Sequence, residues 1–129
     1  MKENRIAVVT GAASVIGLAS SGRLAADGFT VVLLDRSDQV TACAEALRDS
    51  GFKADSVVGD LTEPATIQAV PRFLQEGYGR CDVLVNNAGV ATRAPGKEPS
   101  FQELSRDDWE YVIAVNLTAP FLLSQAVFR

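Results

Sequence analysis

Short apolar runs alternate with stretches of helical periodicity along the chain. Four such runs predict β-strands, at residues 6–10, 30–34, 53–58 and 82–86. The first two are rich in β-branched residues and apolar enough to be buried on both faces of a sheet. The third is more polar, so we expect it to lie nearer a sheet edge.

Helical stretches follow the strands, and small or capping residues mark their ends. We expect helices over about residues 17–26, 37–50, 62–75 and from 105 towards the C-terminus, with a loop at 90–104. Gly28 and Gly51 are suited to end the first two helices. Pro71 falls inside the third and is expected to kink or divide it. Ser105-x-x-Asp108 predicts a capping box at the start of the last helix.

This order of elements predicts an α/β fold with a doubly wound parallel sheet. Strands that alternate with helices imply right-handed βαβ crossovers, with helices on both faces of the sheet. The expected strand order is 3-2-1-4, as in a Rossmann-type fold. We expect residues 1–129 to form one such domain, with 47% apolar residues available for its core.

Composition excludes several classes of function. The net charge of -4 argues against a nucleic-acid partner, which needs clustered basic charge. The chain has no histidine, and Cys43 and Cys81 fit no zinc spacing or disulfide framework, so no metal site is expected. No uninterrupted apolar run approaches a membrane span, and strand-like sequence begins at once after the N-terminus, which indicates no signal peptide. A cytoplasmic location is the simplest expectation.

The turn after the first strand is rich in small residues. It runs Thr10-Gly11-Ala12-Ala13-Ser14-Val15-Ile16-Gly17 and opens a predicted helix. Small residues let backbone N–H groups at a helix N-terminus approach a pyrophosphate. An ordinary glycine-rich turn between strand and helix is the alternative interpretation.

An acidic residue stands where a dinucleotide site needs one. Asp35 follows Gly17 by 18 residues, at the end of the second strand, near the spacing at which a carboxylate binds a ribose. The same carboxylate would repel a 2′-phosphate, which favours NAD over NADP. Arg36 could instead receive a 2′-phosphate, so NADP stays open. The alternative for Asp35 is a solvent-exposed helix-capping residue.

Five ordered motifs resemble the short-chain dehydrogenase/reductase family over nearly the whole chain: Thr10-Gly11-x-x-x-Val15-x-Gly17, Asp35, Asp60-Leu61, Asn86-Asn87-Ala88-Gly89, and Asn116 within Val115-Asn116-Leu117. The resemblance implies a pyrophosphate site at Gly11, Ser14, Val15, Ile16 and Gly17. It also implies a ribose site at Asp35 with Arg36 beside it, and an adenine site at Asp60 and Leu61. Asn87, Ala88 and Gly89 would border the cofactor, and Asn116 would belong to a catalytic tetrad of Asn, Ser, Tyr and Lys.

Physical reasoning from the residues agrees with these positions. Asp60 and Asn86 lie at carboxyl ends of predicted parallel strands, where open α/β sheets bind ligands. Asn116 is a polar residue in an apolar helix, so a buried amide there must either tie down backbone or hold water. Asn86 and Asn87 could alternatively serve only to stabilise a turn.

The chain departs from the family pattern at two points. Val15 replaces the middle glycine, and its branched side chain is expected to crowd the pyrophosphate or resist the required backbone angles. The family's Tyr-x-x-x-Lys pair is absent: Tyr78 and Tyr111 are followed four residues later by Asp82 and Val115. The chain therefore resembles the N-terminal, cofactor-binding half of such an enzyme, and we expect it to be inactive alone.

Two apolar surfaces indicate missing neighbours. Residues 83–85 would form an apolar edge strand, and the last helix is apolar around much of its circumference. We expect a homo-oligomer through that helix. The functional hypothesis is an NAD(P)-dependent oxidoreductase acting on a small-molecule alcohol or carbonyl substrate. The alternative is a non-catalytic dinucleotide-binding or interaction fragment.

Overall fold

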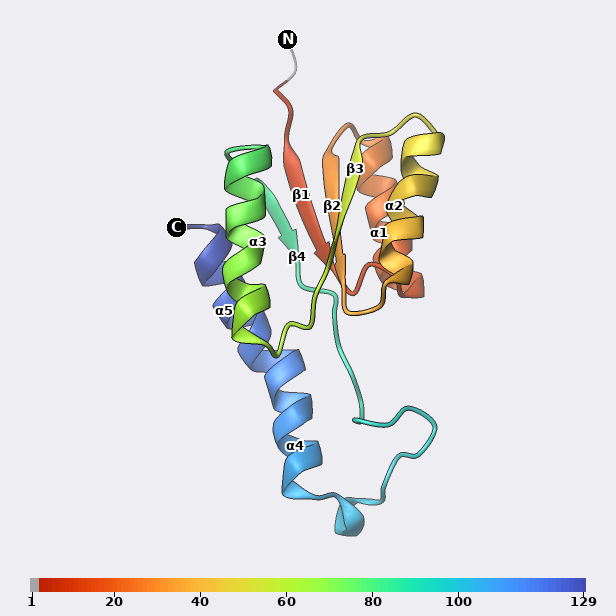
Figure 1. Cartoon of the computed structure of the whole chain (residues 1–129). Helices are drawn as coiled ribbons and strands as arrows, with labels where there is room; N and C mark the ends of the chain where they lie inside the picture. Colours follow the sequence, from red (N-terminus) through yellow and green to blue (C-terminus); the bar gives the residue numbers. More distant parts are fainter. Residues whose placement is uncertain (1–2) are drawn as a thin grey trace.

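A computed structural model describes residues 3–129 as a parallel sheet covered by helices on both faces (Figure 1). The sheet has four strands in the order β3-β2-β1-β4, as the sequence predicted. Its strands are β1 (Ile6–Thr10), β2 (Thr30–Asp35), β3 (Ala54–Val58) and β4 (Val83–Val85). β4 is shorter than the expected 82–86 run.

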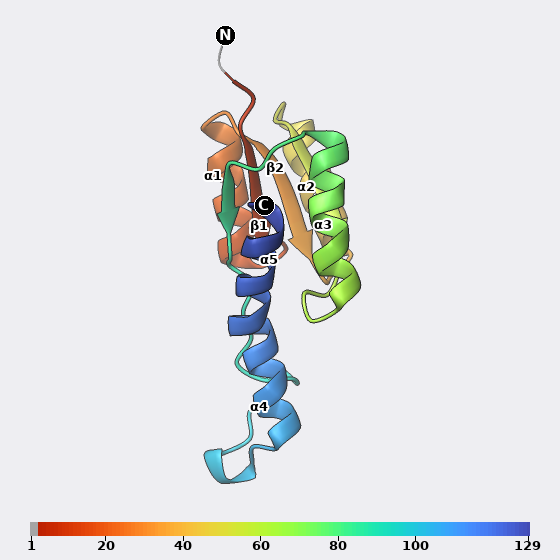
Figure 2. The ribbon, with the colours of Figure 1, turned by 90° about the vertical axis from the view of Figure 1, so that its left-hand side faces the viewer.

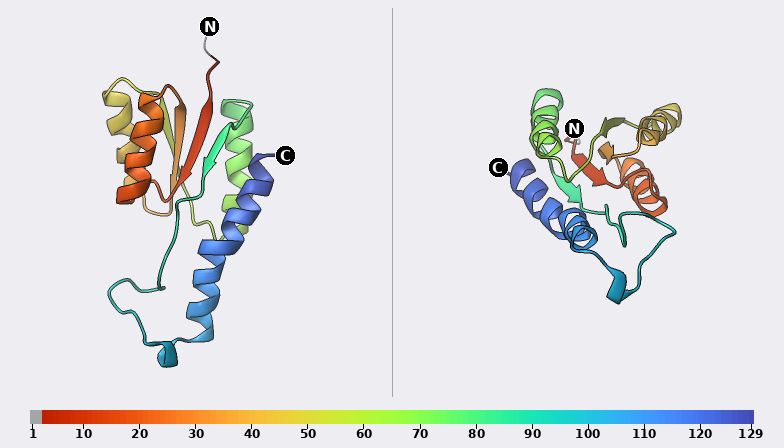
Figure 3. Two further views of the ribbon diagram at one scale, coloured as in Figure 1. Left: turned by 180° about the vertical axis from the view of Figure 1, so that it is seen from behind. Right: turned by 60° about the horizontal axis from the view of Figure 1, so that its bottom comes forward.

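The core has two layers because side chains alternate along each strand. On one face, Val9, Val31 and Leu33 pack against α1 (Val15–Ala26) and α2 (Gln39–Asp49). On the other face, Val8, Val32 and Leu34 pack with residues of α3 (Pro64–Gly77) and α5 (Ala119–Val127). Figure 3 shows the two helix pairs on opposite sides of the sheet. All β1 residues are buried, as the apolar pattern predicted.

The first and third predicted helices each differ from the structure in one respect. The first begins at Val15 rather than Gly17, because the Ser14 hydroxyl accepts a hydrogen bond from the Gly17 N–H at 3.3 Å and caps the helix there. The third is not divided at Pro71 but continues to Gly77. Val70 and Leu74, on either side of this proline, are buried, and their packing holds the helix together.

The predicted last helix consists of three segments: α4 (Arg106–Ile113), a π-helical turn η2 (Ala114–Thr118), and α5. Pro120 has no N–H and cannot donate to the carbonyl of Asn116, so the regular hydrogen-bond ladder is interrupted there. A short 3₁₀ turn, η1 (Phe101–Glu103), lies within the predicted loop. Figure 2 shows α4 extending past the end of the sheet.

The expected capping box at Ser105 is only half formed. Its hydroxyl accepts from the Asp108 N–H at 3.1 Å, but the Asp108 carboxylate contacts that hydroxyl rather than the Ser105 N–H. The reciprocal pair forms at Ser100 and Glu103 instead, at the start of η1.

By length and composition alone, the continuous helical run Arg106–Val127 could cross a membrane. The sequence expectation considered only uninterrupted apolar runs and so did not consider this helix. One such helix is weak support for a membrane span, since core helices of soluble proteins pass the same test. Leu123 and Ala119 of this run are buried in the present fold.

Candidate functional site

A cleft opens where the sheet strands end. Nine of the residues expected to bind a cofactor line it: Gly11, Ser14, Asp35, Arg36, Asp60, Leu61, Asn87, Ala88 and Gly89. Leu34, Gly59, Val90, Tyr111 and Val115 complete the lining. The expected residues Val15, Ile16, Gly17 and Asn116 lie outside it. The cleft therefore joins the ends of all four strands to α4 and η2, as expected for ligand sites in open α/β sheets.

Two glycines are required by the close packing of the first turn. Gly11 has a φ of 62°, and a Cβ there would lie 2.9 Å from the Ala88 Cα atom. A Cβ on Gly17 would lie 2.2 Å from the Gly11 carbonyl oxygen. A side chain at either position would therefore push α1 or the segment after β4 away from the turn.

The helix N-terminus presents free donors beside the cleft. The Ala13 N–H donates to Asp35 Oδ2 at 2.9 Å, and the Ser14 N–H donates to the Gly11 carbonyl at 3.1 Å. Within residues 3–129, the next two N–H groups, those of Val15 and Ile16, have no acceptor. Unpaired N–H groups at a helix N-terminus favour an anion.

The Val15 side chain is 88% exposed and packs against little of the protein. The expectation that it resists the backbone angles of the turn is wrong. Val15 is the first residue of α1, and none of the described residues other than glycine has a positive φ. Its branched side chain therefore stands in the open, next to the free N–H groups.

A hydrogen-bond network ties the first turn to the segment after β4. The Asn87 amide donates to the Thr10 carbonyl at 3.1 Å and lies 3.2 Å from the Gly11 carbonyl. The Thr10 hydroxyl accepts from the N–H groups of Asn87 and Ala88 at 3.1 and 3.0 Å. The sequence analysis did not predict that the Thr10 hydroxyl connects these two segments. A hydroxyl at the end of an otherwise apolar, buried strand could have indicated it, because a buried hydroxyl needs a hydrogen-bond partner.

Asp35 is held in the cleft by its neighbours. Its Oδ2 accepts from Ala13, and its Oδ1 accepts from the Ser37 N–H at 2.9 Å. Each carboxylate oxygen keeps capacity for a second hydrogen bond. Asp60 is similarly oriented, since its Oδ1 accepts from the Thr62 N–H at 2.9 Å and from the Thr62 hydroxyl at 2.7 Å.

Arg36 leaves β2 and reaches α4. Its Nη1 donates a hydrogen bond to the Tyr111 hydroxyl, a contact between residues 75 positions apart. Sequence reasoning treated Tyr111 only as a candidate for the missing Tyr-x-x-x-Lys pair. Nothing in the local pattern predicts that it faces the cleft.

Asn116 clamps the segment that follows β4. Its Oδ1 accepts from the Val90 N–H at 2.8 Å, and its Nδ2 donates to the Val90 carbonyl at 2.7 Å. The amide therefore ties down backbone, one of the two roles considered from sequence. The expectation that it is buried is wrong: Asn116 is exposed, because it sits in the π-helical turn at the margin of the fold. Asn86 donates separately to the Ser124 hydroxyl at 3.2 Å.

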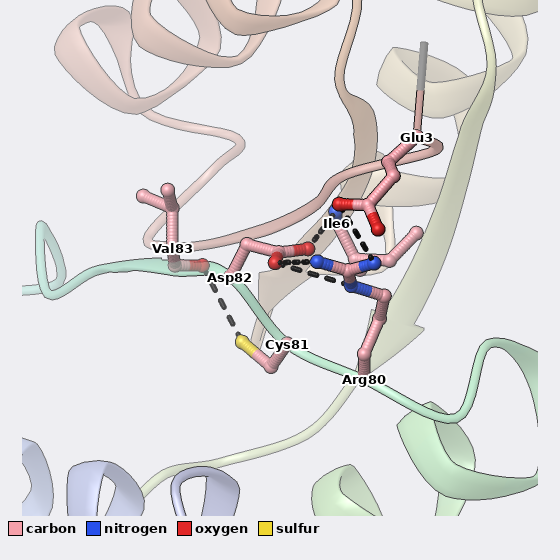
Figure 4. Close-up of polar contacts among 6 residues, drawn as sticks. All are labelled: Glu3, Ile6, Arg80, Cys81, Asp82 and Val83. Atoms are coloured by element: carbon pink, nitrogen blue, oxygen red, sulfur yellow. Dashed lines mark hydrogen bonds and ion pairs between the residues drawn. The ribbon is translucent and has the colours of Figure 1, made fainter. Parts of the chain in front are cut away.

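A second polar cluster lies at the other end of the sheet, where β1 and β4 begin (Figure 4). Asp82 Oδ2 accepts from the Ile6 N–H at 2.8 Å, and Asp82 pairs with Arg80. The Arg80 guanidinium, followed by the Ile6 N–H, holds the pKa of Asp82 below its ordinary value. Burial raises the pKa of the neighbouring Cys81 thiol. This cluster joins β1 to the start of β4 and lies away from the cleft.

Tyr78 is also placed for structure. Its hydroxyl donates to Asp55, and burial followed by this hydrogen bond raises the pKa of Tyr78. A raised pKa disfavours the phenolate, which makes Tyr78 poorly suited to exchange protons near neutral pH. Among residues 3–129, no three metal-binding side chains gather into a cluster.

Comparison with known proteins identifies the family of the chain. The sequence model of the family described as short chain dehydrogenase matches residues 5–129. The chain belongs to this family. It is 37% identical over 125 residues to the uncharacterized oxidoreductase YxjF of Bacillus subtilis (strain 168), covering 96% of the chain and 47% of that protein. The chain spans about half the length of the curated relatives it matches.

Solved structures of the same family share the fold. A metagenomic short-chain oxidoreductase crystallised in complex with NADP superposes with a TM-score of 0.84 at 38% identity, covering 95% of this chain and 54% of that one. L-Sorbose reductase from Gluconobacter frateurii, complexed with NADPH and L-sorbose, has a TM-score of 0.86 at 28% identity, covering 97% of this chain and 46% of that one.

Proposed function

We propose that this short-chain dehydrogenase chain forms the nucleotide-binding portion of an NAD(P)-dependent oxidoreductase. The whole protein would transfer hydride between the nicotinamide and a small alcohol or carbonyl substrate. The observation that carries the proposal is the pair of unpaired N–H groups, on Val15 and Ile16, beside a cleft at the strand ends. The NADP and NADPH complexes of two similar structures support the class of cofactor.

The pyrophosphate would lie at the N-terminus of α1. There the N–H groups of Val15 and Ile16 would donate to it, with Ser14 and the close-packed Gly11 and Gly17 shaping the turn. Asp60 and Leu61 would border the adenine, and Asn87, Ala88 and Gly89 would form the floor below the cofactor.

Asp35 would hydrogen-bond the adenosine ribose through the free lone pairs of its carboxylate. A 2′-phosphate at the same position would meet a like charge, so we propose a preference for NAD over NADP. Arg36 supplies a positive charge next to Asp35, which makes the preference a matter of degree. The similar structures were crystallised with NADP or NADPH, which favours a site that also admits the phosphorylated nucleotide.

Asn116 would act as a positioning residue within this mechanism. Both ends of its amide are engaged by Val90, so it would hold the backbone beside the cofactor. A bound nicotinamide would supply or accept the hydride. The 129 residues contain no Tyr-x-x-x-Lys pair to exchange the substrate proton, so we propose that they bind nucleotide without turnover.

The exposed apolar side chains of η2 and α5 favour assembly of a homo-oligomer. Leu117 and Phe121 are 65% and 64% exposed. A Phe121→Ser variant should sediment as a smaller species than the unmodified chain, whereas Phe52→Ser, on the α2–β3 connection, should not. Equal sedimentation of all three would contradict this assembly.

For location, we propose the cytoplasm, which fits the unpaired cysteines Cys43 and Cys81.

Calorimetric titration with NADH tests the proposed function. The folded 129-residue chain should bind one NADH, and added alcohols or ketones should produce no steady change in NADH absorbance. A folded chain that binds neither NADH nor NADPH would contradict the nucleotide site. Steady turnover by a sample of verified mass would contradict the proposed division between binding and catalysis.

A further inference from the structure

The contact between Arg36 and Tyr111 crosses the cleft. Arg36 directly follows Asp35 at the end of β2, whereas Tyr111 lies on α4. Both line the cleft, and the Tyr111 hydroxyl accepts from Arg36 Nη1. The two side chains therefore join the sheet to a helix that otherwise extends past it (Figure 2).

This contact draws the Arg36 guanidinium towards α4. Asp35 faces the turn before α1, since its Oδ2 accepts from Ala13. Arg36 instead extends to α4, and within residues 3–129 it forms no ion pair. The Asp35 carboxylate and the Arg36 guanidinium therefore contact different sides of the same cleft.

The geometry matters because arginine binds phosphate best with two donors at once. The planar guanidinium presents parallel N–H groups that fit two oxygens of one phosphate. The bond to Tyr111 takes one Nη1 donor and holds the guanidinium towards α4, so a phosphate beside Asp35 could use the remaining paired donors, Nε and Nη2, only if Arg36 turned. A 2′-phosphate would then meet the Asp35 carboxylate without full compensation.

We propose that Tyr111 is a positioning residue that withholds Arg36 from a 2′-phosphate and so strengthens the preference for NAD. This inference rests on the proposed nucleotide site and assigns a determinant of its specificity. Removal of one hydroxyl on α4 would release Arg36 to turn towards the ribose.

The test compares Kd values for NADH and NADPH in Tyr111→Phe, Arg36→Ala and the double variant. We expect Tyr111→Phe to bind NADPH about five to ten times more tightly, because a hydrogen bond to a charged group becomes available to the phosphate. The NADH affinity should change by a smaller factor, so the ratio of NADPH to NADH affinity should rise. In the Arg36→Ala background, Tyr111→Phe should leave the ratio of NADPH to NADH affinity unchanged, which separates the positioning of Arg36 from general packing. Tyr78→Phe removes the other tyrosine hydroxyl and should leave the NADPH-to-NADH ratio unchanged.

Two distinct failures are possible. If Tyr111→Phe leaves the ratio unchanged, weakens NADPH binding, or weakens both nucleotides equally, the role of Tyr111 is refuted while the nucleotide site stands. If the folded unmodified chain binds neither nucleotide, the proposed function is refuted and this inference falls with it.

Discussion

At the scale of single residues, Asp35 serves both the fold and the proposed site. Its two oxygens accept hydrogen bonds from Ala13 and Ser37, which fixes the carboxylate in the cleft. A carboxylate fixed in this way discriminates between ligands more sharply than a mobile one, because it cannot turn away from a like charge.

An Asp35→Ala variant should therefore narrow the preference for NADH over NADPH. NADH loses a ribose acceptor, and NADPH loses a repulsive neighbour. The variant should also lose about 1–3 kcal/mol of unfolding free energy, because two N–H groups lose their acceptor. Paired nucleotide titrations and urea unfolding measure the two effects. Asp38→Ala, at an exposed carboxylate without a capping hydrogen bond, is the matched control. Equal or stronger discrimination in Asp35→Ala would overturn the ribose assignment.

Val15 is the second residue with a local consequence. Its side chain is almost wholly exposed beside the free N–H groups, where a pyrophosphate would approach. Val15→Gly should tighten NADH binding by roughly fivefold, equivalent to about 1 kcal/mol. It should also lower stability by about 0.5–1 kcal/mol, since glycine disfavours a helix. Val15→Ala should lie between the two in affinity. An unchanged Kd across the series would show that Val15 does not crowd the ligand.

At the scale of elements, α1 depends on one glycine and tolerates change at another. Gly17 is packed against the first turn, whereas a Cβ on Gly22 would meet nothing within 4 Å. Gly17→Ala should lose about 2–4 kcal/mol of unfolding free energy because the turn must open. Gly22→Ala should gain about 0.5–1 kcal/mol from helix propensity. Urea unfolding of both variants checks the pair, and similar effects at the two positions would contradict the packing described here.

The hydrogen bond and ion pair of Asp82, which connect β1 to the start of β4, should make the stability of the chain depend on pH in acid. The pKa of Asp82 is lowered from its ordinary value of 3.8, chiefly by the hydrogen bond with Arg80. Its charged form therefore contributes stability above about pH 4, and that contribution is lost as pH falls through the lower folded pKa.

Asp82→Asn keeps an acceptor for Ile6 but removes the charge. Its unfolding free energy should be lower than that of the unmodified chain at pH 7 and should fall less steeply below pH 4. Denaturant unfolding across this pH range measures the slope. Asp49→Asn, at the exposed end of α2, serves as the control. If the unfolding free energy of Asp82→Asn fell as steeply below pH 4 as that of the unmodified chain, Asp82 would not contribute to the acid dependence of stability.

Local patterns were sufficient to predict the strands and their order, because buried parallel strands have a strong apolar signature. They were not sufficient for the last helix, where a π-helical turn precedes Pro120 and Asn116 forms hydrogen bonds with Val90, 26 positions away. The division expected at Pro71 does not occur, because the burial of Val70 and Leu74 outweighs the loss of one hydrogen bond. The partnership of Arg36 with Tyr111 was beyond reach, since only the folded chain brings α4 to the end of β2.

At the scale of the whole molecule, the candidate site is assembled from all four strands. The first turn, the ends of β2 and β3, and the segment after β4 all face one cleft. Four of the five motifs that resemble the family contribute expected cofactor-binding residues to this cleft, whereas Asn116 of the fifth lies outside it. Half the length of the relatives is therefore sufficient to bring these motifs together at one cleft.

The most direct test of this account is an NMR titration of the isotope-labelled chain with NAD. We predict the largest amide shifts at Val15 and Ile16, followed by Asp35, Asp60 and Ala88. The amide chemical shifts of residues near the start of β4, such as Arg80 and Asp82, should not change. Two results would contradict the central claim that the carboxyl ends of the strands form the nucleotide site. One is saturable chemical-shift changes confined to the amino-terminal ends of the strands or to α5, and the other is no chemical-shift change in a folded sample.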